Sequence, residues 1–328
     1  MKLRLRCGAR SALWPAAVVV TALLLRNHAD GAGLESSGPA EPPPEAPVRS
    51  PEVLVQAPEP RFVAPTLRDR IGRIWAPVLI NGRGPFRMVL DTGASDSAIT
   101  APVAAALGLV PSPSHLVLVQ GVAGSAIVPT VRVDSLTVGD LEVASVTLPI
   151  VADALGGAEG VLGTGAFSDK RIDIDFRHDR ITIARSHGQH APLGFVILAL
   201  ERSGPGLLMV AGSVAGVRVH AVIDTGAERS IGNEALRRAL VSRHAQGTPD
   251  QIFDVTTHVA GGELFASPPI MLGEIEIRGA RITYGEVRIF EHWHLTRDPA
   301  LLIGMDALGV LDVLIIDYRR HELQLRMR

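Results

Sequence analysis

The chain contains an internal duplication that restricts its fold more than any other feature. Residues 76–93 (APVLINGRGPFRMVLDTG) align without a gap with residues 209–226 (MVAGSVAGVRVHAVIDTG). Each copy has two apolar runs joined by a glycine-containing turn, which predicts a strand, a turn and a second strand. Each second strand then runs directly into an Asp-Thr-Gly corner. Because a repeat of this length implies repeated structure, we expect two similar β lobes.

The two halves stay alike beyond these corners. Thr100 and Asn233 each lie nine residues after the aspartate of their half and are typical N-caps of the short helices expected to follow. GVAGS at 121–125 matches HVAGG at 258–262, and both are expected at the tips of hairpins. Each half ends with two apolar residues and a glycine, followed by two more strands. These closing segments are Val161-Leu162-Gly163 and Leu302-Ile303-Gly304.

Composition agrees with a mostly β fold. Aromatic residues make up 4% of the chain, whereas apolar residues make up 47%, and there are 33 glycines. A net charge of -2 gives no field that would gather nucleic acid or an anionic membrane. We therefore expect two β lobes related by a pseudo-twofold axis, with few short helices and no nucleic-acid partner.

The N-terminal residues predict export. Residues 1–30 have a basic start, an apolar stretch over 12–25 and then small residues, as in a signal peptide. The stretch is short for a membrane span, so cleavage is favoured, with an uncleaved N-terminal anchor as the alternative. The only cysteine, Cys7, lies in this segment, so the exported part has no disulfide. A bacterial periplasm or cell envelope is the expected location, with the mature chain secreted or membrane-anchored.

The remaining chain divides into four parts. Residues 31–66 are rich in proline and are expected to form a linker or stalk, with a removable pro-segment as the alternative. The first lobe is expected at 67–185, an inter-lobe linker at 186–194 and the second lobe at 195–328.

The paired corners indicate acid–base chemistry. A pseudo-twofold axis would bring Asp91 and Asp224 face to face, and two carboxylates a few ångströms apart share one proton. One is then a general base and the other a general acid, which is the arrangement needed to activate a water. Thr92 and Thr225 are placed to hydrogen-bond across to the opposite half. Gly93 and Gly226 allow close approach of the backbone.

These motifs resemble those of the retropepsin-like aspartic peptidases, with both lobes in one chain. The resemblance covers about residues 67–328 and implies an endopeptidase with Asp91 and Asp224 as its catalytic dyad. It implies a polypeptide substrate, no metal or organic cofactor, and a complete site in a monomer. A membrane tether through the N-terminus remains open, and a non-catalytic peptide-binding module of the same fold is the alternative function.

The resemblance also assigns supporting roles. The glycine-ending segments are expected to pack behind the catalytic corners, and a mobile hairpin is expected over the cleft. The residues given these roles are the scaffold Leu162, Gly163, Ile303 and Gly304, and the hairpin tips Val122, Ala123, Gly124, Val259, Ala260 and Gly261.

Two departures from the pepsin pattern have consequences. Neither expected tip carries a tyrosine. Ala94 and Ala227 stand where pepsin-like enzymes usually carry a hydroxyl that can bond a catalytic carboxylate. Because loss of a donor to the charged form raises a carboxyl pKa, we expect an activity optimum less acidic than that of pepsin. His292 and His294 are interpreted as part of a surface loop, because no third metal ligand is evident beside them.

Overall fold

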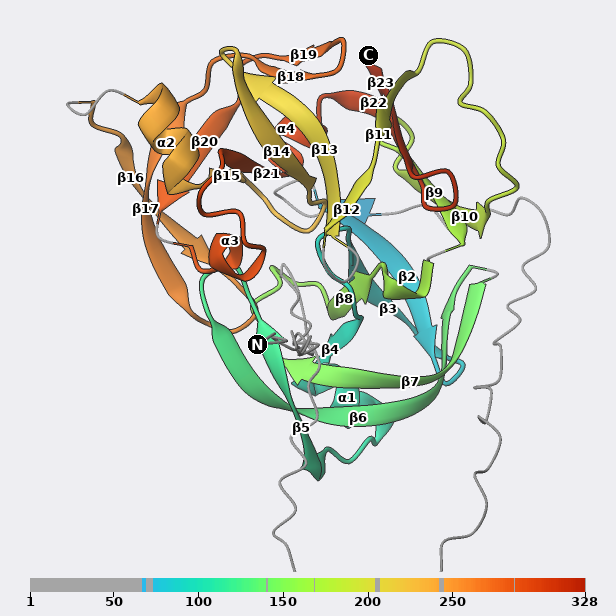
Figure 1. The fold of residues 1–328 in the computed structure, drawn as a ribbon. Helices are drawn as coiled ribbons and strands as arrows, with labels where there is room; N and C mark the ends of the chain where they lie inside the picture. Colours follow the sequence, from blue (N-terminus) through green and yellow to red (C-terminus); the bar gives the residue numbers. More distant parts are fainter. Residues whose placement is uncertain are drawn as a thin grey trace, which may run out of the picture.

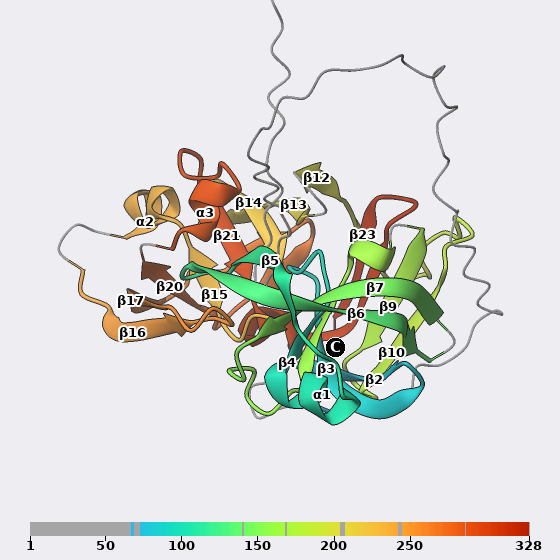
Figure 2. The ribbon, with the colours of Figure 1, turned by 90° about the horizontal axis from the view of Figure 1, so that it is seen from below.

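The computed structural model describes residues 67–68 and 73–327, apart from 140, 168, 204–206, 242–244 and 286. The expected signal peptide and proline-rich linker lie outside these residues. The described chain is mostly β and forms two lobes, as expected. Figures 1 and 2 show strands of the first lobe in blue to green and those of the second in yellow to red.

The first lobe is built on one mixed sheet of order β1-β2-β3-β8-β4-β7-β6-β5. Its strands are β1 (Leu67–Arg68), β2 (Ile74–Ile80), β3 (Arg83–Asp91), β4 (Ala98–Thr100), β5 (Ser112–Gln120), β6 (Ser125–Val138), β7 (Leu141–Val151) and β8 (Gly160–Gly163). A short helix, α1 (Ala101–Leu107), follows β4, and a 3₁₀ turn (Gly165–Phe167) follows β8.

The second lobe repeats this arrangement with the order β16-β17-β20-β15-β21-β14-β13-β18-β19, and β12 pairs with β13. Its strands are β12 (Glu201–Ser203), β13 (Leu207–Val214), β14 (Val217–Ile223), β15 (Ser230–Gly232), β16 (Thr248–Phe253), β17 (Val259–Ala266), β18 (Ile270–Leu272), β19 (Ile275–Ile277), β20 (Arg281–Gly285) and β21 (Ala300–Ile303). Its helices are α2 (Glu234–Leu240), α3 (Ile289–His292) and α4 (Met305–Leu308).

Strand pairing shows that the duplication is structural. In the first lobe β3 pairs in parallel with β8, with Val89 opposite Val161. In the second lobe β14 pairs in parallel with β21, with Val222 opposite Leu302. Both strand pairs are buried, so each Asp-Thr-Gly corner is placed by a rigid apolar strand and backed by its glycine-ending segment.

A third sheet combines the two halves. Its order is β10-β9-β22-β23-β11, from β9 (Lys170–Asp175), β10 (Arg180–Arg185), β11 (Val196–Ala199), β22 (Leu311–Asp317) and β23 (Glu322–Met327). β9 pairs with β22 along its length. The closing strands of both halves therefore form one surface, and the two lobes are joined by a sheet as well as by a chain segment.

The expected helices form, but their N-caps differ. Asn233 Oδ1 accepts a hydrogen bond from Leu236 N at 2.9 Å and so caps α2. Thr100 makes no side-chain cap on α1, since its hydroxyl donates to Glu159 O at 3.2 Å. The hydroxyl therefore fixes the loop before β8 rather than the helix.

Candidate active site

Asp91 and Asp224 occupy corresponding positions at the ends of buried strands. Asp91 is the last residue of β3, and Asp224 directly follows β14. Their exposed fractions are 1% and 0%, which is unusual for aspartate. The strand pairs that place them cannot shift without disrupting the core.

The glycines show how closely the two corners approach. A Cβ added to Gly226 would lie 2.4 Å from Asp91 Cγ, and one added to Gly93 would lie 2.8 Å from Asp224 Oδ2. Each glycine therefore lies against the carboxyl group of the other lobe, and any side chain there would displace that group. The corners lie face to face, with the two carboxyl groups between them.

Backbone N–H groups point at both carboxyl groups. Gly93 N donates to Asp91 Oδ1 at 2.9 Å. Gly226 N and Ala227 N donate to Asp224 Oδ1 at 2.9 and 3.0 Å. Asp91 Oδ2 is buried and has no hydrogen-bond partner in the described part of the chain. A buried carboxyl oxygen of this kind is costly unless another polar group meets it, and the neighbouring carboxyl group of Asp224 is such a group when the pair shares a proton.

The pKa of Asp91 is raised well above its ordinary value of 3.8. Burial is the largest cause and the neighbouring charge of Asp224 is the next, whereas the N–H groups of Gly93 and Ala94 act in the opposite direction. The pair therefore keeps a proton at pH values where an exposed aspartate is ionised.

Two threonines tie the corners together. Thr92 N donates to Thr225 Oγ1 at 3.1 Å, and Thr225 N donates to Thr92 Oγ1 at 3.0 Å. The hydroxyls in turn donate across the axis, Thr92 to Ile223 O at 2.8 Å and Thr225 to Leu90 O at 2.6 Å. These bonds cross between the lobes and are buried, so they fix the separation of the carboxyl groups.

The glycine-ending segments lie behind the corners. Leu162 and Ile303 are buried, and a Cβ on Gly163 or Gly304 would come within 2.3 Å of Asp96 O or 2.6 Å of Arg229 C. Gly163 N donates to Ser97 Oγ at 3.1 Å, and Gly304 N donates to Ser230 Oγ at 3.2 Å. This serine pair was not predicted from the sequence, although Ser97 and Ser230 each lie six residues after the aspartate of their half.

Ala94 and Ala227 are both buried beside the carboxyl groups. Ala227 provides one of the N–H donors to Asp224, and Ala94 N lowers the pKa of Asp91. Their side chains are methyl groups, so this support comes from the backbone alone.

One expected hairpin tip is placed correctly and the other is wrong. The first hairpin, β5–β6, turns at Gly121–Gly124 and so includes Val122, Ala123 and Gly124 at its tip. The second hairpin, β16–β17, turns at residues 254–258. Val259, Ala260 and Gly261 lie instead in β17, paired with β16. The likeness of GVAGS to HVAGG misled the prediction, because the second turn is longer and is closed by Asp254, whose Oδ1 accepts from Thr256 N at 2.8 Å.

Asp254 also joins the two hairpins. Its Oδ2 accepts hydrogen bonds from Ala123 N at 2.7 Å and from Gly124 N at 3.1 Å. The close approach is confirmed at Gly124, where a Cβ would lie 2.4 Å from the His258 ring. The two tips therefore touch through a carboxylate, and sequence reasoning gave no sign of this role.

A cavity of about 980 Å³ lies beside Asp91. The first lobe contributes Arg73, Val89, Asp91, Val122, Ala154, Leu155, Gly156 and Val161; the second contributes residues 226–229 and 249–255 with Ile231, Gly261, Gly262 and Thr283. In the cavity wall, Arg229 Nη1 and Asp250 Oδ1 form an ion pair at 2.8 Å. Such a volume is large enough for several residues of an extended peptide.

Other candidates from the sequence lie away from this site. Tyr284 and Tyr318 are buried outside both hairpin tips. Asp175 accepts hydrogen bonds from the backbone of Arg177 and His178 in a turn. Among the described residues, no three metal-ligating side chains gather, around His292 and His294 or elsewhere.

The structure has two similar β lobes, and in each lobe a buried strand leads into an aspartate. The two aspartates meet across a pseudo-twofold axis. This arrangement defines the bilobal acid-protease class. A family model described as "Aspartyl protease" matches residues 76–166 and 210–307, one match in each half. The chain belongs to this aspartyl protease family. No curated protein matches the chain significantly. In the part of the chain that the structure describes, every helix is too short or too polar to span a membrane.

Proposed function

We propose that this protein hydrolyses internal peptide bonds with a water activated between Asp91 and Asp224. The observation that carries the proposal is the facing pair of buried carboxyl groups, one of which has a raised pKa. Family membership supports a peptidase of this kind.

The geometry supports a division of labour between the two aspartates. In this proposal Asp91, with its raised pKa, holds the shared proton, and Asp224, which accepts two backbone N–H bonds, serves as the base. Asp224 takes a proton from the water as its oxygen attacks the scissile carbonyl carbon, while Asp91 gives its proton to the carbonyl oxygen. The tetrahedral intermediate then breaks its C–N bond as the proton on Asp224 passes to the leaving nitrogen, and Asp91 takes back a proton from one of the two hydroxyl groups, which leaves a carboxylic acid and an amine.

The alternative is a peptide-binding module of the same fold without turnover. The test is digestion of a mixed peptide library by the purified protein from pH 3 to 8, beside Asp91→Asn and Asp224→Asn. Asp134→Asn, an exposed substitution on β6, is the matched control. We expect both dyad variants to lose cleavage and the control to retain it. Library peptides that bind a folded wild type without being cut would favour the binding module, and cleavage that survives in either dyad variant would refute a shared dyad.

Export is part of the proposal and depends on the basic and apolar pattern of residues 1–30. Fractionation of the producing cells, with the mass of the mature chain, distinguishes a cleaved signal from an anchor. A mature chain that begins after the apolar stretch supports release, and an intact chain in the membrane fraction supports a tether. An intact chain in the cytosol would contradict export.

A further inference from the structure

We propose that residues 287–299, through Phe290, Trp293 and Leu295, close the substrate cleft on the Asp224 side of the dyad. The protein would then accept large substrate side chains on one side of the scissile bond and only small ones on the other. The inference rests on the proposed peptidase function and adds a substrate specificity to it.

The two lobes differ most at one connection. In the first lobe residues 152–159 join β7 to β8, whereas in the second lobe the longer segment 286–299 joins β20 to β21. β8 and β21 are the strands behind the two catalytic corners, so these connections lie on opposite sides of the dyad. The pseudo-twofold symmetry of the site is therefore broken where substrate side chains would lie.

The short connection leaves room on the Asp91 side. Ala154, Leu155 and Gly156 line the cavity there, and the Arg73 guanidinium donates to Leu155 O at 2.7 Å. Asp91 lines this cavity, and Asp224 is not among its lining residues.

The long connection carries bulky apolar side chains instead. Phe290 is 2% exposed, Trp293 8% and Leu295 7%. The rings of Phe290 and Trp293 pack edge to face, with centroids 5.7 Å apart. All three belong to a buried apolar cluster that includes Val222 and Leu302 beside Asp224 and also reaches Val89 and Val161 beside Asp91. None of the three lines the cavity.

The two hairpins can be compared position by position. Gln120–Ser125 and Phe253–Val259 are the last strand pairs before the two tips, so Val117 and Val119 correspond to Asp250 and Ile252.

Asp250 and Ile252 line the cavity, whereas Val117 and Val119 do not. Val117 and Val119 are 3% and 0% exposed and share a buried cluster with Phe290 and Trp293, a cluster that also extends to Ile252 at 7% exposed. Figure 1 shows α3 beside the end of the first hairpin. The second hairpin thus lies over the open cavity on the Asp91 side. The equivalent face of the first hairpin packs against side chains on the Asp224 side.

The long connection is also held firmly. Asn233 Nδ2 donates to Leu295 O at 2.5 Å and to Asp298 O at 2.7 Å, while its Oδ1 accepts from Ala300 N at 3.1 Å. A segment fixed by a buried side chain cannot swing away at little cost when substrate binds. We therefore treat it as a fixed wall that determines specificity.

The experiment is a cleavage-site profile of a peptide library by the full chain, read by mass spectrometry on both sides of every cut bond. We expect a preference of about tenfold or more for glycine, alanine or serine on one side, with large residues accepted on the other. Equal acceptance of large residues on both sides by the wild type would overturn the inference while leaving the peptidase proposal intact. Absence of cleavage would overturn both.

Variants assign the restriction to its residues. Trp293→Ala and the milder Phe290→Leu are expected to admit larger residues on the restricted side, whereas Arg297→Ala, exposed on the same segment, leaves the profile unchanged. Folded variants that keep the wild-type profile would refute the role of these side chains. If both variants fail to fold, Ile252→Trp gives the reciprocal test, because it fills the open side and must exclude large residues there.

Discussion

Thr92 and Thr225 each donate a backbone N–H to the hydroxyl oxygen of the other, at 3.1 and 3.0 Å. Their own hydroxyls donate to the carbonyl groups that precede the opposite aspartate by one residue. Four buried hydrogen bonds thus join the lobes directly beneath the two carboxyl groups. This arrangement couples the stability of the inter-lobe contact to the geometry of the site.

We predict that Thr92→Val lowers the free energy of unfolding by about 1–3 kcal/mol and abolishes most activity. Valine keeps the shape but leaves Ile223 O and Thr225 N without partners, which costs more than a lost bond at the surface. Thr92→Ser, which keeps the hydroxyl, is the control and should retain most of both. Urea unfolding with a peptide cleavage assay measures the effect, and a stable, fully active Thr92→Val would contradict it.

Much of the fold was predictable because the duplication can be recognised from short stretches of the sequence. The Asp-Thr-Gly corners, the strands before them and the glycine-ending segments each need only a few neighbouring residues to be recognised. Asp91 and Asp224 could be paired from sequence because a repeat implies an axis, and an axis implies that equivalent loops meet. The crossed threonine bonds follow from the same argument.

The asymmetric features were not predictable from those patterns. Asp254 acts on Ala123 and Gly124, which are far away in the sequence, so no local pattern connects them. In residues 287–299 the sequence offered two histidines, which were interpreted as part of a surface loop, and no local pattern indicated that Phe290 and Trp293 are buried. The combination of strands from both halves in the third sheet likewise depends on long-range pairing.

We predict that Asp91→Asn stabilises the protein at neutral pH but not at pH 3. Below 3.8 the carboxyl is protonated in both folded and unfolded chains, so the variant gains nothing. As pH rises, Asp91 ionises first in the unfolded chain, whereas in the folded chain Asp91 must keep its proton or become a buried charge. The free energy of unfolding of the wild type therefore falls between about pH 4 and the raised pKa of Asp91. The loss is about 1.4 kcal/mol for each unit by which the pKa of Asp91 in the folded chain exceeds that in the unfolded chain. Thermal unfolding from pH 3 to 7 measures this, and a variant less stable than wild type at pH 7 would show that burial does not dominate.

We predict that Ala94→Ser moves the alkaline limb of the activity profile to lower pH. A hydroxyl beside Asp91 would donate to its charged form and lower the pKa, so the shared proton would be lost earlier as pH rises. The wild type should accordingly work best in mildly acidic to neutral solution. Profiles of kcat/KM from pH 3 to 8 test both statements, with Ala227→Ser as the matched variant at Asp224. A wild-type optimum near pH 2, or no displacement in either variant, would refute the argument.

We predict that Asp254→Asn loosens the contact between the hairpins. Oδ2 accepts two N–H groups from the first hairpin while Oδ1 accepts from Thr256 N. An asparagine has one carbonyl oxygen, so its amide N–H₂ must face N–H donors on one side. Hydrogen exchange at Ala123 and Gly124 should accelerate about tenfold or more, since a buried unmet donor costs 1–3 kcal/mol. Glu263→Gln, on β17 away from the tip, is the control, and unchanged exchange in Asp254→Asn would mean that the tips are held by other contacts.

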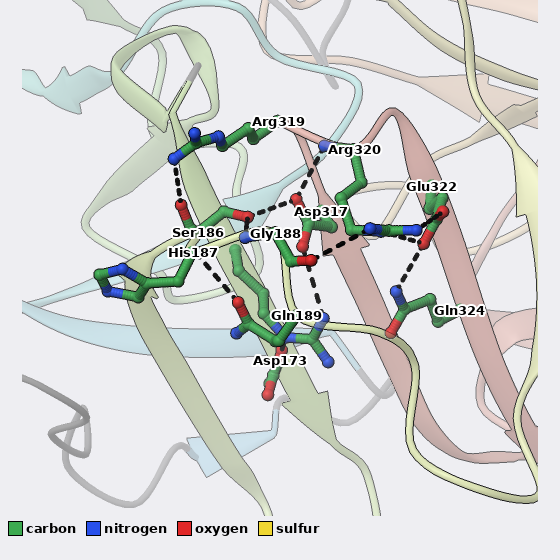
Figure 3. A network of polar contacts seen from close by, with 11 residues as sticks. Asp173, Ser186, His187, Gly188, Gln189, Asp317, Arg319, Arg320, Glu322 and Gln324 are labelled. Carbon is green, nitrogen blue, oxygen red and sulfur yellow. Dashed lines mark hydrogen bonds and ion pairs between the residues drawn. The ribbon is translucent and has the colours of Figure 1, made fainter.

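The inter-lobe linker is fixed by a buried carboxylate, which gives the last prediction. Asp317, at the end of β22, is 0% exposed and accepts from Ser186 Oγ at 2.7 Å and Arg320 N at 3.0 Å (Figure 3). The Arg171 guanidinium lies 3.5 Å from its other oxygen and is itself only 6% exposed. Ser186 begins the linker and Arg171 lies on β9, so one side chain holds the linker and both halves of the third sheet.

Removing one partner of a buried charged group leaves the others uncompensated, which typically costs 3–5 kcal/mol. We expect Asp317→Ala to lose about that much stability in urea unfolding. Asp317→Asn should lose less, because one oxygen still accepts from Ser186. Asp175→Asn, at the end of β9 in the same sheet, keeps one oxygen that can accept from Arg177 N and His178 N, so it should change stability by less than about 1 kcal/mol. If Asp317→Ala is as stable as this control, the linker is held by the strands alone, and the polar network of Figure 3 contributes nothing to the joining of the lobes.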